Sequence, residues 1–113
     1  MHELSLAQSI VDIAVTKARL GHFARVTRIH LSLGALANVE PDALAFGFEA
    51  ARGGTLARDA VLEIERPPGT GRCVDCGAEV SVGRRGDACA RCGGFQILVS
   101  GGDDLRVTEL EVE

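Results

Sequence analysis

The sequence predicts an α+β fold, in which a small domain of two helices and a three-stranded sheet carries an inserted four-cysteine zinc ribbon. Two segments show the 3.6-residue periodicity of amphipathic helices, and three shorter segments alternate apolar and polar residues as strands do. Two Cys-x-x-Cys-Gly motifs lie between the last two of those strands, flanked by Pro/Gly-rich hinges. We therefore expect one domain from residues 1–66, completed by strand 104–113, and a zinc-ribbon domain from residues 67–103.

The first helix is predicted over residues 5–20. Ser5 and Gln8 match the Ser-x-x-Gln capping box, so we expect the helix to begin at Ser5 and residues 1–3 to precede it as a free lead-in. Polar residues recur on one face at steps of four and three, while apolar residues cover most of the rest, so the helix should be largely buried. Gly21 is the residue expected just after its C-terminus.

The remaining elements follow from alternation and from helix start signals. Residues 27–33 alternate apolar and polar side chains up to Gly34, which predicts a half-buried strand. Pro41 suits the first position of a second helix, which should end near Arg52 because two glycines follow. Two further strands are expected, over residues 61–65 and 105–112.

Composition favours a soluble globular protein. Hydrophobic residues make up 46% of the 113 residues and charged residues 25%, which argues against disorder. The net charge of −4 gives little support to binding a nucleic-acid backbone. The opening residues lack the basic and apolar regions of a signal peptide, and no apolar stretch is long enough for a membrane span. We therefore expect a cytoplasmic protein without a membrane partner, in which thiols stay reduced.

The paired cysteine motifs predict a structural zinc site. Twelve residues separate them, and within each motif the two-residue gap lets both thiolates reach one ion, while the following glycine permits a positive φ. Four thiolates fill a tetrahedral shell, so no position is left for a substrate or water. Zinc is favoured as the ion, with a rubredoxin-type iron centre and a disulfide pair as alternatives. The four cysteines are Cys73, Cys76, Cys89 and Cys92.

A second metal site is indicated at the N-terminus. The α-amine of Met1, the deprotonated amide of His2 and the His2 Nδ1 can form fused five- and six-membered chelate rings, and such nitrogen-rich planar coordination suits Ni(II) or Cu(II). Taken singly, Glu40 is interpreted as a carboxylate at the N-terminus of the second helix. The other two histidines, His22 and His30, are interpreted as surface imidazoles.

Taken together, these features resemble the HypA/HybF family of hydrogenase and urease nickel accessory proteins, along the whole chain. The resemblance rests on the opening Met1-His2-Glu3-Leu4-Ser5, the helix start Val39-Glu40-Pro41, the stretch Ala45-Phe46-Gly47-Phe48-Glu49 and the paired cysteine knuckles.

The resemblance implies roles for individual residues. It implies nickel held at the N-terminus around Met1, with His2 essential, Glu3 supporting and Glu40 in the position of a nearby acidic residue. It also implies zinc on the four cysteines. One departure is Ala35, which stands where many members of the family have a glutamate, so no role follows for this position.

The implied function is delivery of Ni(II) to the large subunit of a [NiFe]-hydrogenase, with urease as another possible client, alongside a HypB-type GTPase. Ni(II) is then cargo and Zn(II) a structural cofactor. The residues agree with a protein that is not an enzyme, because no phosphate-binding loop is present and Lys17 is the only lysine. The sequence leaves monomer and homodimer open.

Two rival interpretations remain at this stage. A zinc-ribbon adaptor for nucleic acid or the transcription machinery would need a basic, aromatic ribbon, whereas residues 67–100 hold four arginines, three acids and a single aromatic, Phe95. A rubredoxin-like electron carrier would absorb visible light through its iron–sulfur bonds, and a zinc protein would not.

Overall fold

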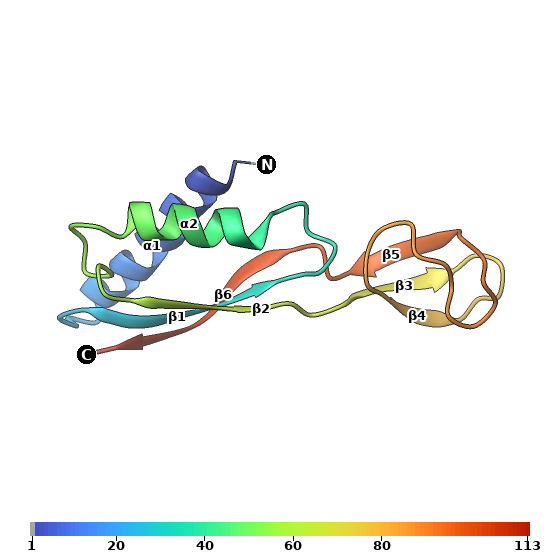
Figure 1. The fold of residues 1–113 in the computed structure, drawn as a ribbon. Helices are drawn as coiled ribbons and strands as arrows, with labels where there is room; N and C mark the ends of the chain where they lie inside the picture. Colours follow the sequence, from blue (N-terminus) through green and yellow to red (C-terminus); the bar gives the residue numbers. More distant parts are fainter. Residues whose placement is uncertain (1) are drawn as a thin grey trace. The chain divides into compact units, whose positions relative to one another are not determined.

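The computed structural model describes residues 2–113, which form two compact units. Unit 1 comprises the chain up to Leu31 together with residues 39–64 and 106–113, and unit 2 comprises residues 32–38 and 65–105. None of the described helices combines the length and apolar content needed to cross a bilayer. The elements, labelled in Figure 1, are α1 (Glu3–Leu20), β1 (Val26–Leu33), α2 (Pro41–Ala51), β2 (Val61–Glu65), β3 (Gly69–Cys73), β4 (Glu79–Val82), β5 (Ile97–Gly101) and β6 (Leu105–Val112).

Helix α1 begins at Glu3, two residues earlier than the sequence predicts, so the expectation that Glu3 belongs to a free lead-in is wrong. His2 is the N-cap, and its carbonyl accepts the first helical hydrogen bond from Leu6 N at 3.1 Å. The predicted capping box does not form, because the Gln8 side chain donates to Asp12 instead. At the other end Gly21 is the C-cap, as expected, but His22 is the residue with a positive φ, at 60°.

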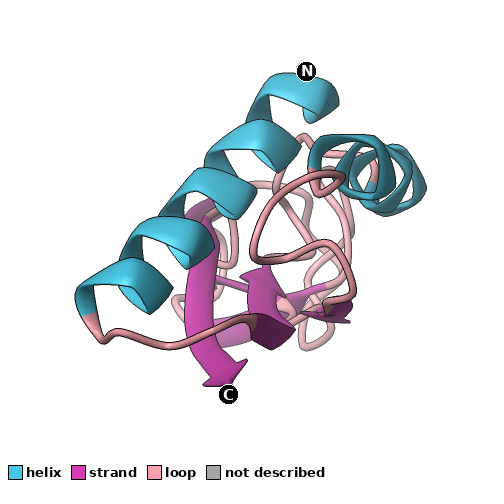
Figure 2. Ribbon diagram, turned by 90° about the vertical axis from the view of Figure 1, so that its left-hand side faces the viewer, coloured by secondary structure: helices cyan, strands magenta, loops and turns pink. Residues whose placement is uncertain are grey.

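The core of unit 1 forms where the two helices meet. Helix α2 contributes buried Leu44 and Phe48, and between them Gly47 lies against α1. A Cβ at Gly47 would lie 3.2 Å from Ala7 Cβ, so the absence of a side chain permits the close approach. Figure 2 shows α2 nearly end-on beside the N-terminal turns of α1. The buried residues of α1 are Ala7, Ile10, Val11, Ala14, Val15 and Ala18, whereas the apolar Ile13 is 45% exposed.

The two helices lie on one side of a three-stranded sheet with the order β2-β1-β6 (Figure 1). Strand β1 buries Ile29 and Leu31, as the alternation predicts. Strand β6 runs antiparallel to β1, because Glu113 N donates to Arg25 O at 3.0 Å while Thr108, five residues earlier, donates through Oγ1 to the carbonyl of His30. The prediction that the last strand pairs with an earlier one is therefore confirmed.

Unit 2 contains a second sheet, with the order β4-β3-β5 and both pairs antiparallel. Three backbone segments of unit 2 approach one another closely at Gly34, Gly69 and Gly102. A Cβ on Gly34 would overlap the carbonyl group of Gly102, so this approach requires glycine. The segments are joined by hydrogen bonds from Gly34 N to Asp104 O, 2.9 Å, and from Leu36 N to Gly102 O, 2.8 Å.

Candidate metal centres

The four cysteines of unit 2 converge on one point. The Sγ atoms of Cys73 and Cys92 lie 3.6 Å apart, those of Cys76 and Cys89 lie 3.8 Å apart, and all four fall within 4.8 Å of one another. Four thiolates around one zinc, with Zn–S bonds of about 2.3 Å, are separated by roughly 3.8 Å in a tetrahedron. The observed separations are far longer than a disulfide bond of about 2.05 Å, and all four cysteines are free. The residues therefore form a four-cysteine zinc-binding cluster.

The two knuckles repeat the same backbone turn. Gly77 N donates to Cys73 O and Gly93 N donates to Cys89 O, both at 2.8 Å. Both glycines have a positive φ, 74° and 79°, as the sequence predicts. In the second knuckle the backbone N–H groups of Arg91 and Gly94 point at sulfur, each with a donor-to-sulfur distance of 3.4 Å. Such N–H groups stabilise negative charge on the ligand sulfurs.

The electrostatics of the cluster favour a bound cation. The N–H groups of Cys92 and then Arg91 lower the pKa of the Cys89 thiol to about 7. At Cys92 the N–H of Gly94 acts in the same direction, but the Cys73 sulfur and burial outweigh it and raise the pKa to about 12. Without a metal, Cys89 therefore loses its proton readily and Cys92 keeps its proton, because two adjacent thiolates would repel each other. A divalent ion removes this conflict, since it compensates the negative charge of both.

The second candidate centre is the N-terminus of α1. Glu3, in the first turn of α1, accepts a hydrogen bond through Oε2 from Glu40 N, 3.3 Å away. Glu40 is in turn the N-cap of α2, and its Oε1 accepts from Asp42 N at 2.9 Å. The structure therefore brings the Glu3 carboxylate to the backbone of Glu40, and His2, the residue before Glu3, is exposed. Among the described residues His2, Glu3 and Glu40 do not form a cluster of metal-ligand atoms, and Met1 lies outside the described residues.

The carboxylate of Glu3 is held in its charged form. Its pKa lies below the model-compound value of 4.5, first because of its own backbone N–H and then because of the N–H of Glu40. The Glu3 side chain is thus a carboxylate at neutral pH, on the residue that follows His2.

The remaining histidines differ from each other. His22 is exposed in the turn after α1. His30 on β1 has a side chain that is 30% exposed and forms ion pairs with glutamates of β6. The interpretation of His30 as a simple surface imidazole missed these contacts, which join residues about 80 positions apart in the sequence.

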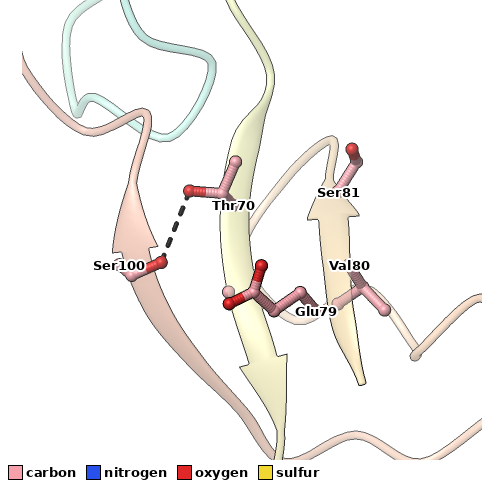
Figure 3. A pocket seen from close by; sticks show the side chains of 6 residues that line it. Thr70, Glu79, Val80, Ser81 and Ser100 are labelled. Carbon is pink, nitrogen blue, oxygen red and sulfur yellow. Dashed lines mark hydrogen bonds between the residues drawn. The ribbon is translucent and has the colours of Figure 1, made fainter.

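A polar hollow of about 380 Å³ lies on the ribbon sheet and offers no further chemistry. Figure 3 shows its lining, with Thr70 and Ser100 joined by a hydrogen bond of 3.4 Å. Its one charged lining residue, Glu79, is paired with Arg72 at 3.2 Å. No nucleophile with an adjacent base stands among the lining residues.

Comparison with known proteins identifies the family. The sequence profile described as hydrogenase/urease nickel incorporation, metallochaperone, HypA matches residues 1–112. The chain is 48% identical to the hydrogenase maturation factor HypA of Bradyrhizobium sp. (strain ORS 278) and 48% identical to that of Alkalilimnicola ehrlichii, in each case over 113 residues and 100% of both chains.

Solved structures show the same fold. The solution structure of the Ni metallochaperone HypA from Helicobacter pylori superposes with a TM-score of 0.69 at 22% identity, covering 99% of this chain and 97% of that one. A second solution structure of a HypA protein gives a TM-score of 0.72 at 21% identity, with 100% and 97% covered. By its full-length sequence match, this chain belongs to the HypA family of hydrogenase and urease nickel-incorporation metallochaperones.

Proposed function

We propose that this chain is a nickel metallochaperone, which binds Ni(II) at the N-terminus of α1 and delivers it during maturation of a [NiFe]-hydrogenase. Residues 1–66 with strand 104–113 form the nickel domain, and residues 67–103 form a ribbon held by one structural Zn(II). The family and the names of the relatives support this role. Urease is the second client class that the family description includes.

The proposed nickel ligands are the α-amine of Met1 and the backbone amide and Nδ1 of His2. Glu3 supplies a supporting oxygen, and Glu40 holds Glu3 in place through the hydrogen bond from its backbone N–H. Deprotonated amide nitrogen and imidazole form the strong, planar ligand field that Ni(II) prefers. Zinc in the cysteine cluster is coordinated by four sulfurs with no open position. The two sites therefore select different metals, because one offers sulfur ligands and the other nitrogen ligands.

The observation that carries this proposal is the position of His2 as the N-cap of α1. Its carbonyl takes part in the helix, but the N–H of an N-cap residue lies ahead of the first helical hydrogen bond. The amide can therefore lose its proton and bind a metal without cost to the helix. The charged Glu3 begins the same helix, so its carboxylate is held on a regular element directly after His2.

The protein has no catalytic role in this proposal. Nucleotide hydrolysis belongs to a HypB-type GTPase, and the hydrogenase large subunit receives the metal; both partners and this chain are cytoplasmic. No phosphate-binding loop occurs in the sequence, and the net charge of −4 does not favour nucleic acid. The isolated chain should therefore hydrolyse neither GTP nor ATP, and turnover in a contaminant-free preparation would contradict the proposal.

The test is Ni(II) titration of the untagged, zinc-loaded chain by calorimetry and absorption. His2→Ala should abolish tight binding, whereas the matched control His22→Ala, another exposed histidine next to a terminus of α1, should leave it unchanged. A chain with two residues added before Met1 should also lose affinity, because the amine no longer adjoins His2. If the extended chain bound Ni(II) as tightly as the natural one, the amine–amide–imidazole chelate would be wrong.

The role of Glu40 needs a conservative substitution. Glu40→Ala removes the cap of α2 along with the charge, and loss of a cap costs about 0.5–2 kcal/mol. Glu40→Gln retains a side-chain oxygen for capping Asp42 N. We expect Glu40→Gln and Glu3→Gln to weaken nickel binding less than His2→Ala does, with the zinc content unchanged.

A further inference from the structure

A third group of metal-binding side chains lies on the sheet of unit 1, apart from the cysteines and from the N-terminus of α1. His30 on β1 faces Glu109 and Glu111 on β6. One ligand atom from each of the three residues lies within 4.8 Å of those from the other two. The proposed nickel site uses none of these residues.

The sheet pairing holds the three side chains together. Glu109 and Glu111 are two positions apart on β6, so both point to the same face of the sheet. Strand β1 is the neighbour of β6, and hydrogen bonds from Thr108 Oγ1 to His30 O, 3.2 Å, and from Thr27 Oγ1 to Glu111 O, 3.1 Å, join the two strands beside these residues. The donors therefore stand on two hydrogen-bonded strands, which makes the arrangement rigid.

The distances between the ligand atoms suit a single ion. His30 Nε2 lies 2.7 Å from Glu111 Oε2 and 3.4 Å from Glu109 Oε2. Nitrogen and oxygen ligands bind first-row divalent ions at about 2.0–2.2 Å, which places adjacent ligand atoms roughly 3.0 Å apart in an octahedron and roughly 3.4 Å apart in a tetrahedron. The two distances from His30 lie within about 0.4 Å of the octahedral value, and the two glutamate oxygens lie within 4.8 Å of each other.

The charges around the cluster leave it anionic. Arg28 lies 3.5 Å from Glu111 Oε2, but it also forms an ion pair with Glu63, so its one positive charge is shared. Glu109 Oε2 lies 3.4 Å from His30 Nε2, and that pair is charged only if His30 is protonated. With a neutral imidazole, two adjacent carboxylates face the histidine nitrogen, and a divalent cation compensates both.

We propose that His30, Glu109 and Glu111 form a second binding site for a first-row divalent cation. One imidazole and two carboxylates are donors for ions such as Mn(II), Co(II), Ni(II) and Zn(II), and the lack of sulfur separates this site from the cysteine cluster. The side chains are 30%, 67% and 51% exposed, so water completes the coordination shell. The site stands independently of the N-terminal nickel site.

The experiment uses Mn(II) as a paramagnetic probe of the full-length, zinc-loaded chain. Mn(II) prefers oxygen and imidazole to thiolate, so it leaves the zinc cluster intact. The titration is followed by amide NMR in a His2→Ala background, which removes the N-terminal site, so that failure of one proposal cannot be mistaken for failure of the other. We expect the amides of residues 28–31 and 108–112 to broaden at lower Mn(II) concentration than amides elsewhere.

Two variants separate ligation from general attraction to an acidic surface. Glu109→Gln removes a proposed ligand. Glu113→Gln is the control, because it removes a carboxylate just after β6 that pairs with Arg25. Ligand loss should weaken Mn(II) binding by about tenfold or more, whereas the control should change it less than about twofold. Equal losses in the two variants, or broadening spread over all acidic segments, would overturn the proposal. Unchanged amide dispersion in both variants verifies that the fold is retained.

Discussion

Substitution of Gly34 by alanine should destabilise unit 2 strongly. The new Cβ would overlap the carbonyl group of Gly102 and come within 2.9 Å of Asp103 N, all of them backbone atoms that cannot rotate away. Overpacking of this kind costs about 1–3 kcal/mol. The shift also weakens the hydrogen bonds from Gly34 N to Asp104 O and from Leu36 N to Gly102 O, worth about 0.5–1.5 kcal/mol each.

One contribution acts in the opposite direction. Alanine restricts the unfolded chain more than glycine does, which stabilises the folded state by about 0.4–1 kcal/mol. The net loss is therefore about 3 kcal/mol, within a range of about 1–6 kcal/mol. Unit 2 would retain its zinc ligands, but the backbone segments that meet at Gly34 and Gly102 would move apart.

The assay is urea unfolding of the zinc-loaded chain, followed by circular dichroism and by the amide signals of β3 and β5. Gly53→Ala is the matched control, because a Cβ at Gly53 meets no atom within 4 Å. We expect the control to change the free energy of unfolding by less than about 1 kcal/mol. The reasoning is refuted if Gly34→Ala proves as stable as Gly53→Ala.

Two further predictions concern metal and pH. Cys73→Ala should lose zinc, measured by elemental analysis, and should also lose the sheet of unit 2. Most of the helical signal should remain, because the buried residues of α1 and α2 lie in unit 1. A full zinc complement in this variant would contradict the four-thiolate site. Because the pKa of Glu3 is lowered below 4.5, its stabilising effect is present above that pH and is lost as the pH falls through the lowered pKa. The difference in melting temperature between the natural chain and Glu3→Gln should therefore be larger at about pH 6 than at about pH 3, and a constant difference would show that the Glu3 charge has no such role.

Local patterns predicted most of the regular structure. Strands 61–65 and 105–112 were placed correctly because each alternates between apolar and polar residues over most of its length. The predicted start of α1 was wrong because the Ser5–Gln8 pattern is only a local signal. In the structure the first turn includes Glu3, whose carboxylate accepts a hydrogen bond from Glu40 N, 37 positions away. A sequence pattern cannot show such a tertiary contact.

The pairing of the last strand with an earlier one was predicted, but the individual side-chain contacts between distant segments were not. The ribbon strands β3–β5 were not identified individually, since β3 reads Gly-Thr-Gly-Arg-Cys, which has no apolar alternation to follow. The convergence of four cysteines was predicted because the knuckle motif encodes it locally. By contrast, nothing in the surroundings of His30 along the chain points to Glu109 and Glu111, and only the pairing of β1 with β6 brings them together.

The cysteine cluster has an inner and an outer half, and this affects how a metal would leave it. Each knuckle contributes one buried sulfur, Cys73 or Cys89, and one exposed sulfur, Cys76 or Cys92. A chelator or oxidant in solution reaches the exposed pair first, and these two belong to different knuckles. With zinc bound, exchange would begin at Cys76 and Cys92, and the buried Cys73 and Cys89 would still hold both loops together. Release would then be stepwise, and the loops would stay in position for the ion to rebind.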